Sequence, residues 1–155
     1  MPKFTATRRV DLTVDQAFAI AADVASYKDF LPLLNRSVIR GERKRQGNAE
    51  TFDADLQVAF EKLGLRETFT SHVTTNSDNH TVTATSSDGP MKALLAIWKI
   101  ADADNGKADV TIQVDYTMKN MMLQIMASGV TDFVSQKIMQ AFEDRGKVLY
   151  GRALS

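Results

Sequence analysis

Few side chains in this sequence could carry out acid–base or nucleophilic chemistry. The chain has two histidines, His72 and His80, and no cysteine, which excludes thiolate nucleophiles, disulfides and zinc–thiolate sites. On an extended strand His72 points away from the face that carries Phe69 and Ser71, so we expect it in solvent. Neither histidine lies in a nucleophile–base motif, and no phosphate-binding glycine loop is present. The sequence therefore predicts no catalytic residue, no metal ligand and no cofactor, and argues against an enzyme.

Glu67 and Ser71 are the unusual polar residues, because they share a predicted strand face with Phe69. A carboxylate and a hydroxyl that point into an apolar interior need hydrogen-bond partners, since burying them unpaired is costly. The polar head of a bound ligand would meet this need, and so would an ion pair with Arg145 or Lys137. Without such a cation, burial would raise the pKa of Glu67.

A larger set of mostly apolar residues could line a ligand cavity or form an ordinary packed core, and both interpretations stay open. Methionines gather between positions 118 and 126, and their flexible side chains suit a wall that fits a flexible ligand. The predicted ligand-binding residues are Phe30, Leu31, Pro32, Phe60, Glu67, Phe69, Ser71, Trp98, Tyr116, Met122, Met126 and Phe133.

The elements that position these residues follow from a change in hydrophobic period. Residues 3–118 mostly alternate apolar and polar, which is typical of strands with one buried face, whereas residues from Asn120 to about Leu149 repeat at helical spacing. Near the N-terminus, Thr13 and Gln16 form a capping-box signature for a helix ending near residue 24. A very short second helix follows over 26–31, because Pro32 stops it. We expect strands over 3–10, 37–45, 48–60, 66–75, 81–86, 94–100 and 110–118.

This order predicts an α+β helix-grip fold in a single domain of residues 1–155. A curved antiparallel sheet wraps around one long C-terminal helix, and two short helices follow the first strand. A sheet closed by one helix need not fill its interior, so it can leave a lipid-sized cavity.

Several motifs resemble the coenzyme Q-binding family of the START/polyketide-cyclase superfamily. Asp23-Val24, Tyr27 and the run from Phe30 to Pro32 resemble its "DVxxYxxFLP" signature, and Gly89-Pro90 with Leu94 and Trp98 is similar to its "GPxxxLxxxW" segment. One departure is Leu33-Leu34, where relatives often carry an aromatic residue followed by cysteine; the site stays apolar. Further matches are Val58-Ala59-Phe60, residues 67–71, Ala141-Phe142, Arg145 and Leu149-Tyr150-Gly151.

The resemblance implies non-catalytic binding of a polyprenyl quinone such as ubiquinone, by a carrier or chaperone that supports respiratory electron transfer. Bacterial members of the family are also described as toxins that block the association of ribosomal subunits. That alternative needs a basic surface, since phosphate contacts supply most nucleic-acid affinity. No aromatic residue is interleaved with the candidate patch, and a solvated hairpin is the simpler interpretation. The same patch could also contact anionic lipid. The patch comprises Arg36, Arg40, Arg43, Lys44 and Arg45.

Charge and hydropathy indicate where the protein works. The formal net charge is 0, so no overall field draws the protein to nucleic acid or anionic membrane. No apolar run approaches the ~18 residues of a membrane-spanning helix, and the N-terminus lacks a signal-peptide core. We therefore expect a cytoplasmic protein, with transient contact at the inner-membrane surface if it carries quinone. Candidate contact segments are 30–34, 63–65 and 121–122.

Overall fold

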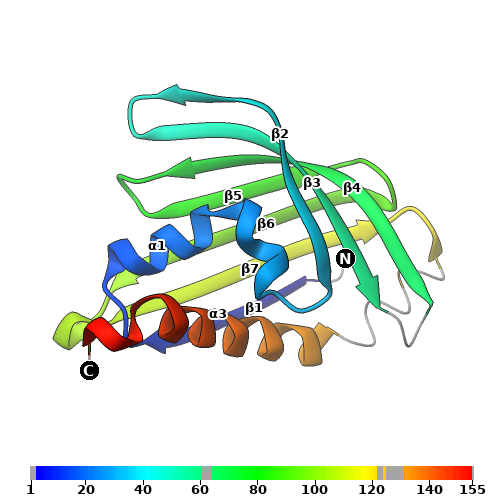
Figure 1. The fold of residues 1–155 in the computed structure, drawn as a ribbon. Coiled ribbons are helices and arrows are strands. Elements are labelled where there is room, and N and C mark those ends of the chain that lie inside the picture. Colours follow the sequence, from blue (N-terminus) through cyan, green and yellow to red (C-terminus); the bar gives the residue numbers. More distant parts are fainter. Residues whose placement is uncertain (1–2, 61–63, 122–123, 125–130, 155) are drawn as a thin grey trace.

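Seven antiparallel strands form one curved sheet in the order β1-β7-β6-β5-β4-β3-β2 (Figure 1). The computed structural model describes residues 3–60, 64–121, 124 and 131–154. The predicted antiparallel sheet is confirmed. Its strands are β1 (Lys3–Val10), β2 (Leu34–Gln46), β3 (Ala49–Phe60), β4 (Leu65–Asn76), β5 (Thr81–Ser86), β6 (Met91–Asp102) and β7 (Ala108–Met118).

Two short helices follow β1, as predicted. Helix α1 (Val14–Ala22) begins with the expected capping box, in which the Gln16 amide donates to Thr13 Oγ1 (3.1 Å) and the Thr13 amide donates to Gln16 Oε1 (3.0 Å). The 3₁₀ helix η1 (Val24–Asp29) follows at once, two residues earlier than expected. A second 3₁₀ turn, η3 (Asp104–Gly106), connects β6 to β7.

The strand faces follow the alternation of the sequence. Across β3 and β4, Ala54 lies opposite Ser71 and Leu56 lies opposite Phe69. All four side chains are buried, whereas His72 on the other face is 66% exposed and its Nδ1 lies 2.6 Å from Asp53 Oδ1. The predicted inward face of these strands is therefore confirmed.

The helices cover one face of the sheet (Figure 1). Helix α1 packs across β5, β6 and β7, η1 packs on β2, and α3 (Thr131–Leu154) runs beside β1. Trp98 of β6 lies against Phe142 of α3, with 5.2 Å between ring centroids. The long C-terminal helix therefore packs on the sheet as predicted. The helix was expected to start at Asn120, but positions 122–123 and 125–130 lie outside the described residues. At its other end, α3 continues past Leu149 to Leu154.

The predicted apolar face of this helix is confirmed only in part. Phe133 and Leu149 were expected on its buried stripe, but their side chains are 57% and 48% exposed. Phe142, which belongs to the same helical repeat, is fully buried as expected, and Met139, which does not belong to it, is buried as well. The physical reason is a close approach at Gly146, where an added methyl group would lie 2.7 Å from Leu12 Cδ1. This contact turns the glycine side of the helix toward the β1–α1 connection, so Phe133 faces solvent rather than the interior.

Candidate functional site

The centre of the inward face carries small side chains on four neighbouring strands, β3 to β6. Ala54 lies opposite Ser71 across β3 and β4, and Ala84 lies opposite Ala96 across β5 and β6. Ser86 of β5 joins this group, because its hydroxyl donates to the Thr70 carbonyl of β4 (2.6 Å). We call these five residues the small-residue floor: Ala54, Ser71, Ala84, Ser86 and Ala96.

The small-residue floor is not fully covered by the helices. Ala84 and Ala96 remain partly exposed although they face inward on two central strands. The next inward pair on the same strands, Val82 opposite Trp98, is buried. Packed interiors leave few voids larger than a water molecule, so the partial exposure of these inward-facing alanines indicates space between the helices and the middle of the sheet. We call this inferred space the hollow.

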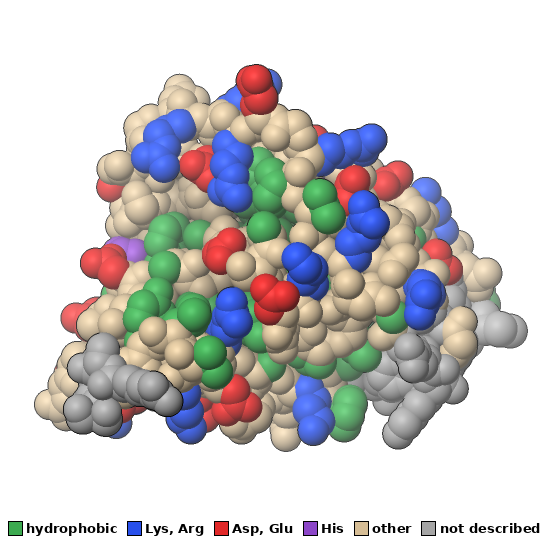
Figure 2. Space-filling model, viewed as in Figure 1, with side chains coloured by type: hydrophobic (Ala, Val, Ile, Leu, Met, Phe, Trp, Pro, Cys, Tyr) green, Lys and Arg blue, Asp and Glu red, His purple; other side chains and the backbone are tan. Residues whose placement is uncertain are grey.

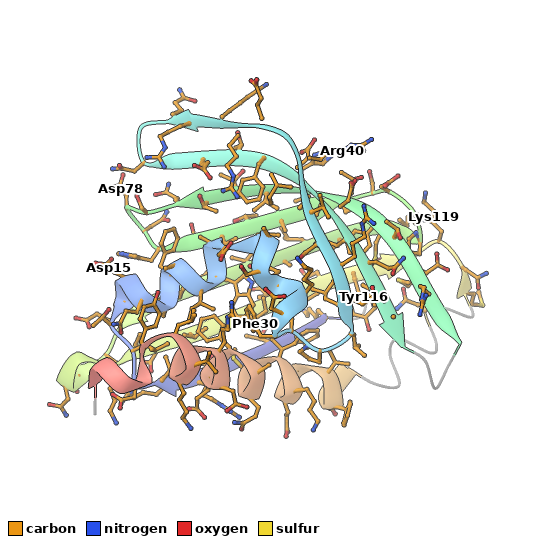
Figure 3. The ribbon with its side chains drawn as sticks, viewed as in Figure 1. Asp15, Phe30, Arg40, Asp78, Tyr116 and Lys119 are labelled. Carbon is orange, nitrogen blue, oxygen red and sulfur yellow. The ribbon has the colours of Figure 1, made fainter. Side chains whose placement is uncertain are left out.

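Apolar side chains extend from this hollow to one end of the sheet. Leu94 lies opposite Tyr116 across β6 and β7, and Phe4 lies opposite Val114 across β1 and β7. Tyr116 is buried, whereas the other three are only partly buried and pack against the core. Met91, at the start of β6, is also partly buried. We call Phe4, Met91, Leu94 and Val114 the apolar strip. Figure 3 labels Tyr116 at this end of the molecule.

The opposite end of the inward face is closed. Trp98 lies against Phe142, and Tyr27 of η1 is buried with its hydroxyl donating to the Ala21 carbonyl. Burial raises the pKa of the Tyr27 phenol. The Phe30 ring packs edge-on against the Tyr27 ring, with 5.9 Å between the ring centroids. Trp98 therefore belongs to the packed side of the interior.

Ser71 is the one floor residue whose polar atom has no partner. Its side chain is completely buried, and its Oγ makes no hydrogen bond with the residues the structure describes. By contrast, the hydroxyl of buried Ser37 donates to the Ala25 carbonyl (2.9 Å) and accepts from the Lys28 amide (3.1 Å). An unpaired buried hydroxyl costs about 1–3 kcal/mol, so a ligand atom that accepts a hydrogen bond would be stabilised there.

Glu67 is in a different environment from the one expected. It lies opposite Val58 near the end of the sheet that carries the apolar strip, and it is partly exposed. Its carboxylate forms no ion pair or side-chain hydrogen bond within the described part of the chain, where Arg145 instead lies over the Phe30 ring at 5.5 Å. The ion pair between Glu67 and Arg145, one of the two alternatives in the sequence, is therefore not formed.

The turn between β5 and β6 is fixed to β4 beside the site. The Thr70 amide donates to Asp88 Oδ2 (3.0 Å), and amide hydrogen bonds from Thr70 and Gly89 lower the pKa of Asp88. Gly89 has a φ of 58°, and a methyl group added there would collide with the Thr68 carbonyl oxygen. The absence of a side chain at Gly89 of the Gly-Pro motif therefore allows this turn to lie directly on β4.

Sequence reasoning located part of this arrangement. The structure brings Phe69, Ser71, Trp98 and Tyr116 onto one face, with Leu31 buried and Phe30 and Pro32 partly exposed. The side chain of Phe60 and residues Met122 and Met126 lie outside the described residues, and Phe133 is at the surface. Sequence reasoning missed Ala84, whose signal was its alternation with Val82 and Ser86.

The basic residues predicted on the first hairpin are partly neutralised. Arg43 and Arg45 lie 2.7 and 3.3 Å from the carboxylate oxygens of Glu50, and these contacts, chiefly the hydrogen bond from Arg43, lower the pKa of Glu50. Arg40 lies 3.8 Å from Asp55. Arg36 and Lys44 are exposed and form no ion pair with any described residue. Figure 2 shows basic and acidic side chains interspersed over this part of the surface.

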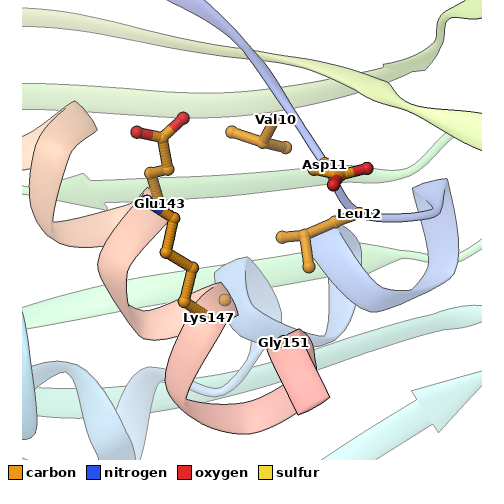
Figure 4. Close-up of a pocket in the computed structure, with 7 residues that line it drawn as sticks. Val10, Asp11, Leu12, Glu143, Lys147 and Gly151 are labelled. Carbon is orange, nitrogen blue, oxygen red and sulfur yellow. The ribbon is translucent and has the colours of Figure 1, made fainter. Parts of the chain in front are cut away.

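A separate cleft of about 210 Å³ lies between the β1–α1 connection and α3 (Figure 4). Its lining includes Asp11, Leu12, Glu143, Gly146 and Lys147. None of the predicted ligand-binding residues lines it.

Comparisons with known proteins agree with this architecture. The family described as "Polyketide cyclase / dehydrase and lipid transport" matches residues 10–143. Ribosome association toxin RatA of Escherichia coli K12 is 27% identical over 150 residues, covering 97% of this chain and 90% of the toxin. Coenzyme Q-binding protein coq10 of Schizosaccharomyces pombe, a mitochondrial protein, is 27% identical over 146 residues, covering 94% and 87%.

The fold is also found among solved structures. The Zhui aromatase/cyclase from Streptomyces sp. R1128 superposes with a TM-score of 0.80 at 16% identity, covering 94% of this chain and 93% of that one. At this identity the likeness shows the helix-grip fold alone. Among the described helices, none is both long and apolar enough to cross a bilayer. The match over residues 10–143 confirms the resemblance inferred from the sequence motifs, and the chain belongs to the polyketide cyclase/dehydrase and lipid transport family.

Proposed function

We propose that this protein binds a polyprenyl quinone, of which ubiquinone is the type, without transforming it. The observation that carries the proposal is the partial exposure of Ala84 and Ala96 at the centre of the inward face. The apolar strip leads from this hollow to one end of the sheet. A relative of similar length is named a coenzyme Q-binding protein, and this supports a quinone rather than another apolar ligand.

The energetics fit a carrier. Burying an isoprenoid tail from water gains about 0.8 kcal/mol per methylene-sized group, but such a tail starts in a bilayer that is as apolar as the protein interior. The tail therefore contributes little net affinity relative to the membrane. Selectivity must come from the quinone head and the shape of the hollow, which suits a protein that loads and releases its ligand at a membrane surface.

Exposed apolar side chains support contact with such a surface. Met121, which follows β7 by three residues, is 80% exposed, and Phe133 at the start of α3 is also exposed, with Lys137 Nζ 5.4 Å from its ring centroid. An apolar side chain beside a cation suits the interface between lipid tails and headgroups. The proposal therefore includes a cytoplasmic protein that works transiently at the inner membrane.

A short-chain ubiquinone titrated into the protein tests the proposal, with binding followed by side-chain NMR shifts. Wild type should bind about one equivalent. Ala96→Leu should weaken binding at least tenfold, because the larger side chain occupies the hollow. Ala101→Leu is the matched control, since Ala101 is exposed on the same strand and faces outward. The proposal would be overturned if ubiquinone caused no NMR shift changes in wild type, or if Ala96→Leu and Ala101→Leu bound it with equal affinity.

Association with a ribosomal subunit is the second candidate, and the basic hairpin is the observation that favours it. Arg36 and Lys44 are available to phosphate groups, and a relative is named a ribosome association toxin. Phosphate contacts make such binding strongly salt-dependent. Purified subunits should then co-sediment with wild type at low salt and less with Arg36→Glu/Lys44→Glu. Lys99→Glu/Lys107→Glu makes the same change in net charge at two exposed positions elsewhere; equal losses in both double variants would exclude the hairpin as the contact.

A further inference from the structure

The unpaired hydroxyl of Ser71 lies inside the small-residue floor, and this combination indicates how a ligand is oriented. Small side chains alone would leave only space. The buried Ser71 Oγ adds a hydrogen-bonding group without a partner among the described residues. Buried polar groups in folded proteins are nearly always satisfied. Among the described residues Asp115 Oδ1 also lacks a partner, but its side chain alternates with inward-facing Val114 and Tyr116, so Ser71 Oγ is the unpaired atom on the inward face and points to an atom that arrives with the ligand.

We propose that the small-residue floor holds the quinone head, with Ser71 Oγ donating a hydrogen bond to one of its carbonyl oxygens, and that the prenyl tail leaves across the apolar strip. The inference rests on the proposed function and deepens it by naming the specificity-determining residue and the direction of the ligand. A serine hydroxyl can donate one hydrogen bond and rotates to suit its acceptor. Ala54 lies opposite Ser71, and Ala84 lies opposite Val73 two residues along β4, so small side chains near Ser71 leave room for a flat ring.

The reverse orientation is less favourable for two reasons. A hydrocarbon tail over the floor would leave the Ser71 hydroxyl unpaired, and a carbonyl over the apolar strip would face the side chains of Phe4, Met91, Leu94 and Val114. The closed side offers no alternative exit, because Trp98 and Phe142 fill it. Only the orientation with the head on the floor pairs both polar groups.

Ser71→Ala tests this orientation. The variant should fold as well as wild type, because the hydroxyl it removes has no partner. It should bind a short-chain ubiquinone about three- to tenfold more weakly, the range expected for one hydrogen bond, yet bind squalene, a polyprenyl hydrocarbon without a head, as wild type does. Ser37→Ala is the matched control, since it removes a buried hydroxyl that is already bonded to Ala25 and should leave the preference for ubiquinone over squalene unchanged.

Infrared spectra of ubiquinone labelled with ¹³C at its carbonyls supply a readout that a structural role would not change. A hydrogen bond lowers the carbonyl stretching frequency, so bound ubiquinone should show one lowered band in wild type and lose it in Ser71→Ala. If wild type and Ser71→Ala bound ubiquinone with the same affinity and showed the same carbonyl bands, water alone would satisfy the Ser71 hydroxyl. That result would overturn this inference, and the proposed function would stand. If wild type binds no ubiquinone, the proposed function itself fails.

Discussion

At the scale of single residues, the turn at Gly89 shows why a glycine stands in the Gly-Pro motif. Its positive φ costs any other residue about 1–2 kcal/mol, and its close approach to Thr68 leaves no room for a side chain. We expect Gly89→Ala to lower the free energy of unfolding by about 2 kcal/mol or more, measured by urea denaturation. Gly106→Ala is the control, because Gly106 also has a positive φ (73°) but no atom within 4 Å of an added methyl group. Equal losses at the two positions would show that the approach to β4 does not matter.

Asp88 should give this turn a pH dependence. Its pKa in the folded protein is lowered below the ordinary 3.8 by amide hydrogen bonds from Thr70 and Gly89. A lowered carboxyl pKa stabilises the folded state above the unfolded pKa, and this contribution is lost as pH falls through the folded value. Wild type should therefore exceed Asp88→Asn in free energy of unfolding at pH 6, with the difference shrinking below about pH 4. A difference that stays constant from pH 6 to pH 2.5 would contradict the assignment.

Single residues also show where sequence reasoning ends. The inward parity of Ser71 followed from strand alternation alone, because successive side chains point to opposite faces. The partner of Arg145 could not be predicted, because the choice between Glu67 and the Phe30 ring depends on how η1 and α3 pack. Contacts within an element were therefore accessible from the sequence, and contacts between elements were not.

At the scale of elements, the strands were predicted more accurately than the C-terminal helix. Phe52, Ala54 and Leu56 alternate with charged residues, so their buried face is unambiguous. The helix carries apolar residues over a wider arc, including Phe133, Met139 and Phe142, and its rotation is fixed by Gly146 against Leu12. Hydrophobic periodicity predicts that an amphipathic helix exists, but it does not determine which of two adjacent faces is buried when both contain apolar residues.

The close approach of α3 to Leu12 can be tested directly. Leucine favours helix by close to 1 kcal/mol relative to glycine, so a replacement in open space should stabilise the protein. At Gly146 the new side chain must enter space that Leu12 fills, and overpacking costs about 1–3 kcal/mol. We expect Gly146→Leu to lower the thermal midpoint. Gly151→Leu should leave it unchanged or raise it, since the nearest atom to a methyl group there is Lys147 Cβ at an ordinary 3.6 Å. If both variants changed the thermal midpoint in the same direction, the result would argue against this packing of Gly146 on Leu12.

At the scale of the whole molecule, the hollow arises from register rather than from any local motif. Ala54, Ser71, Ala84 and Ala96 come from four strands. The register places Ala54 opposite Ser71 and Ala84 opposite Ala96, and Ala84 also lies opposite Val73, two residues along β4 from Ser71. The sequence therefore predicted the helix-grip architecture and several inward residues, but not the position of the small-residue floor. A one-residue slip in any of these pairings would replace inward alanines with outward polar side chains.

A hollow interior predicts a specific relation between stability and binding. If the space above Ala84 is empty in the unliganded protein, Ala84→Leu buries additional apolar surface there and should raise the free energy of unfolding by about 0.5–2 kcal/mol. If the interior were fully packed, the same change would force side chains apart and cost about 1–3 kcal/mol. The sign of the change therefore tests the hollow without any ligand. Ala101→Leu, on the outward face, controls for the effect of leucine on strand stability.

The same variant should also lose the response to ligand. A ligand that binds only the folded state stabilises it by about 2.7 kcal/mol at a free concentration of 100 Kd, so short-chain ubiquinone should raise the thermal midpoint of wild type in a concentration-dependent way. Ala84→Leu should start from a higher midpoint and show little further rise, because the leucine occupies the space of the ligand. A lowered midpoint without ligand, or an undiminished rise with it, would show that the space above Ala84 is not where the ligand binds.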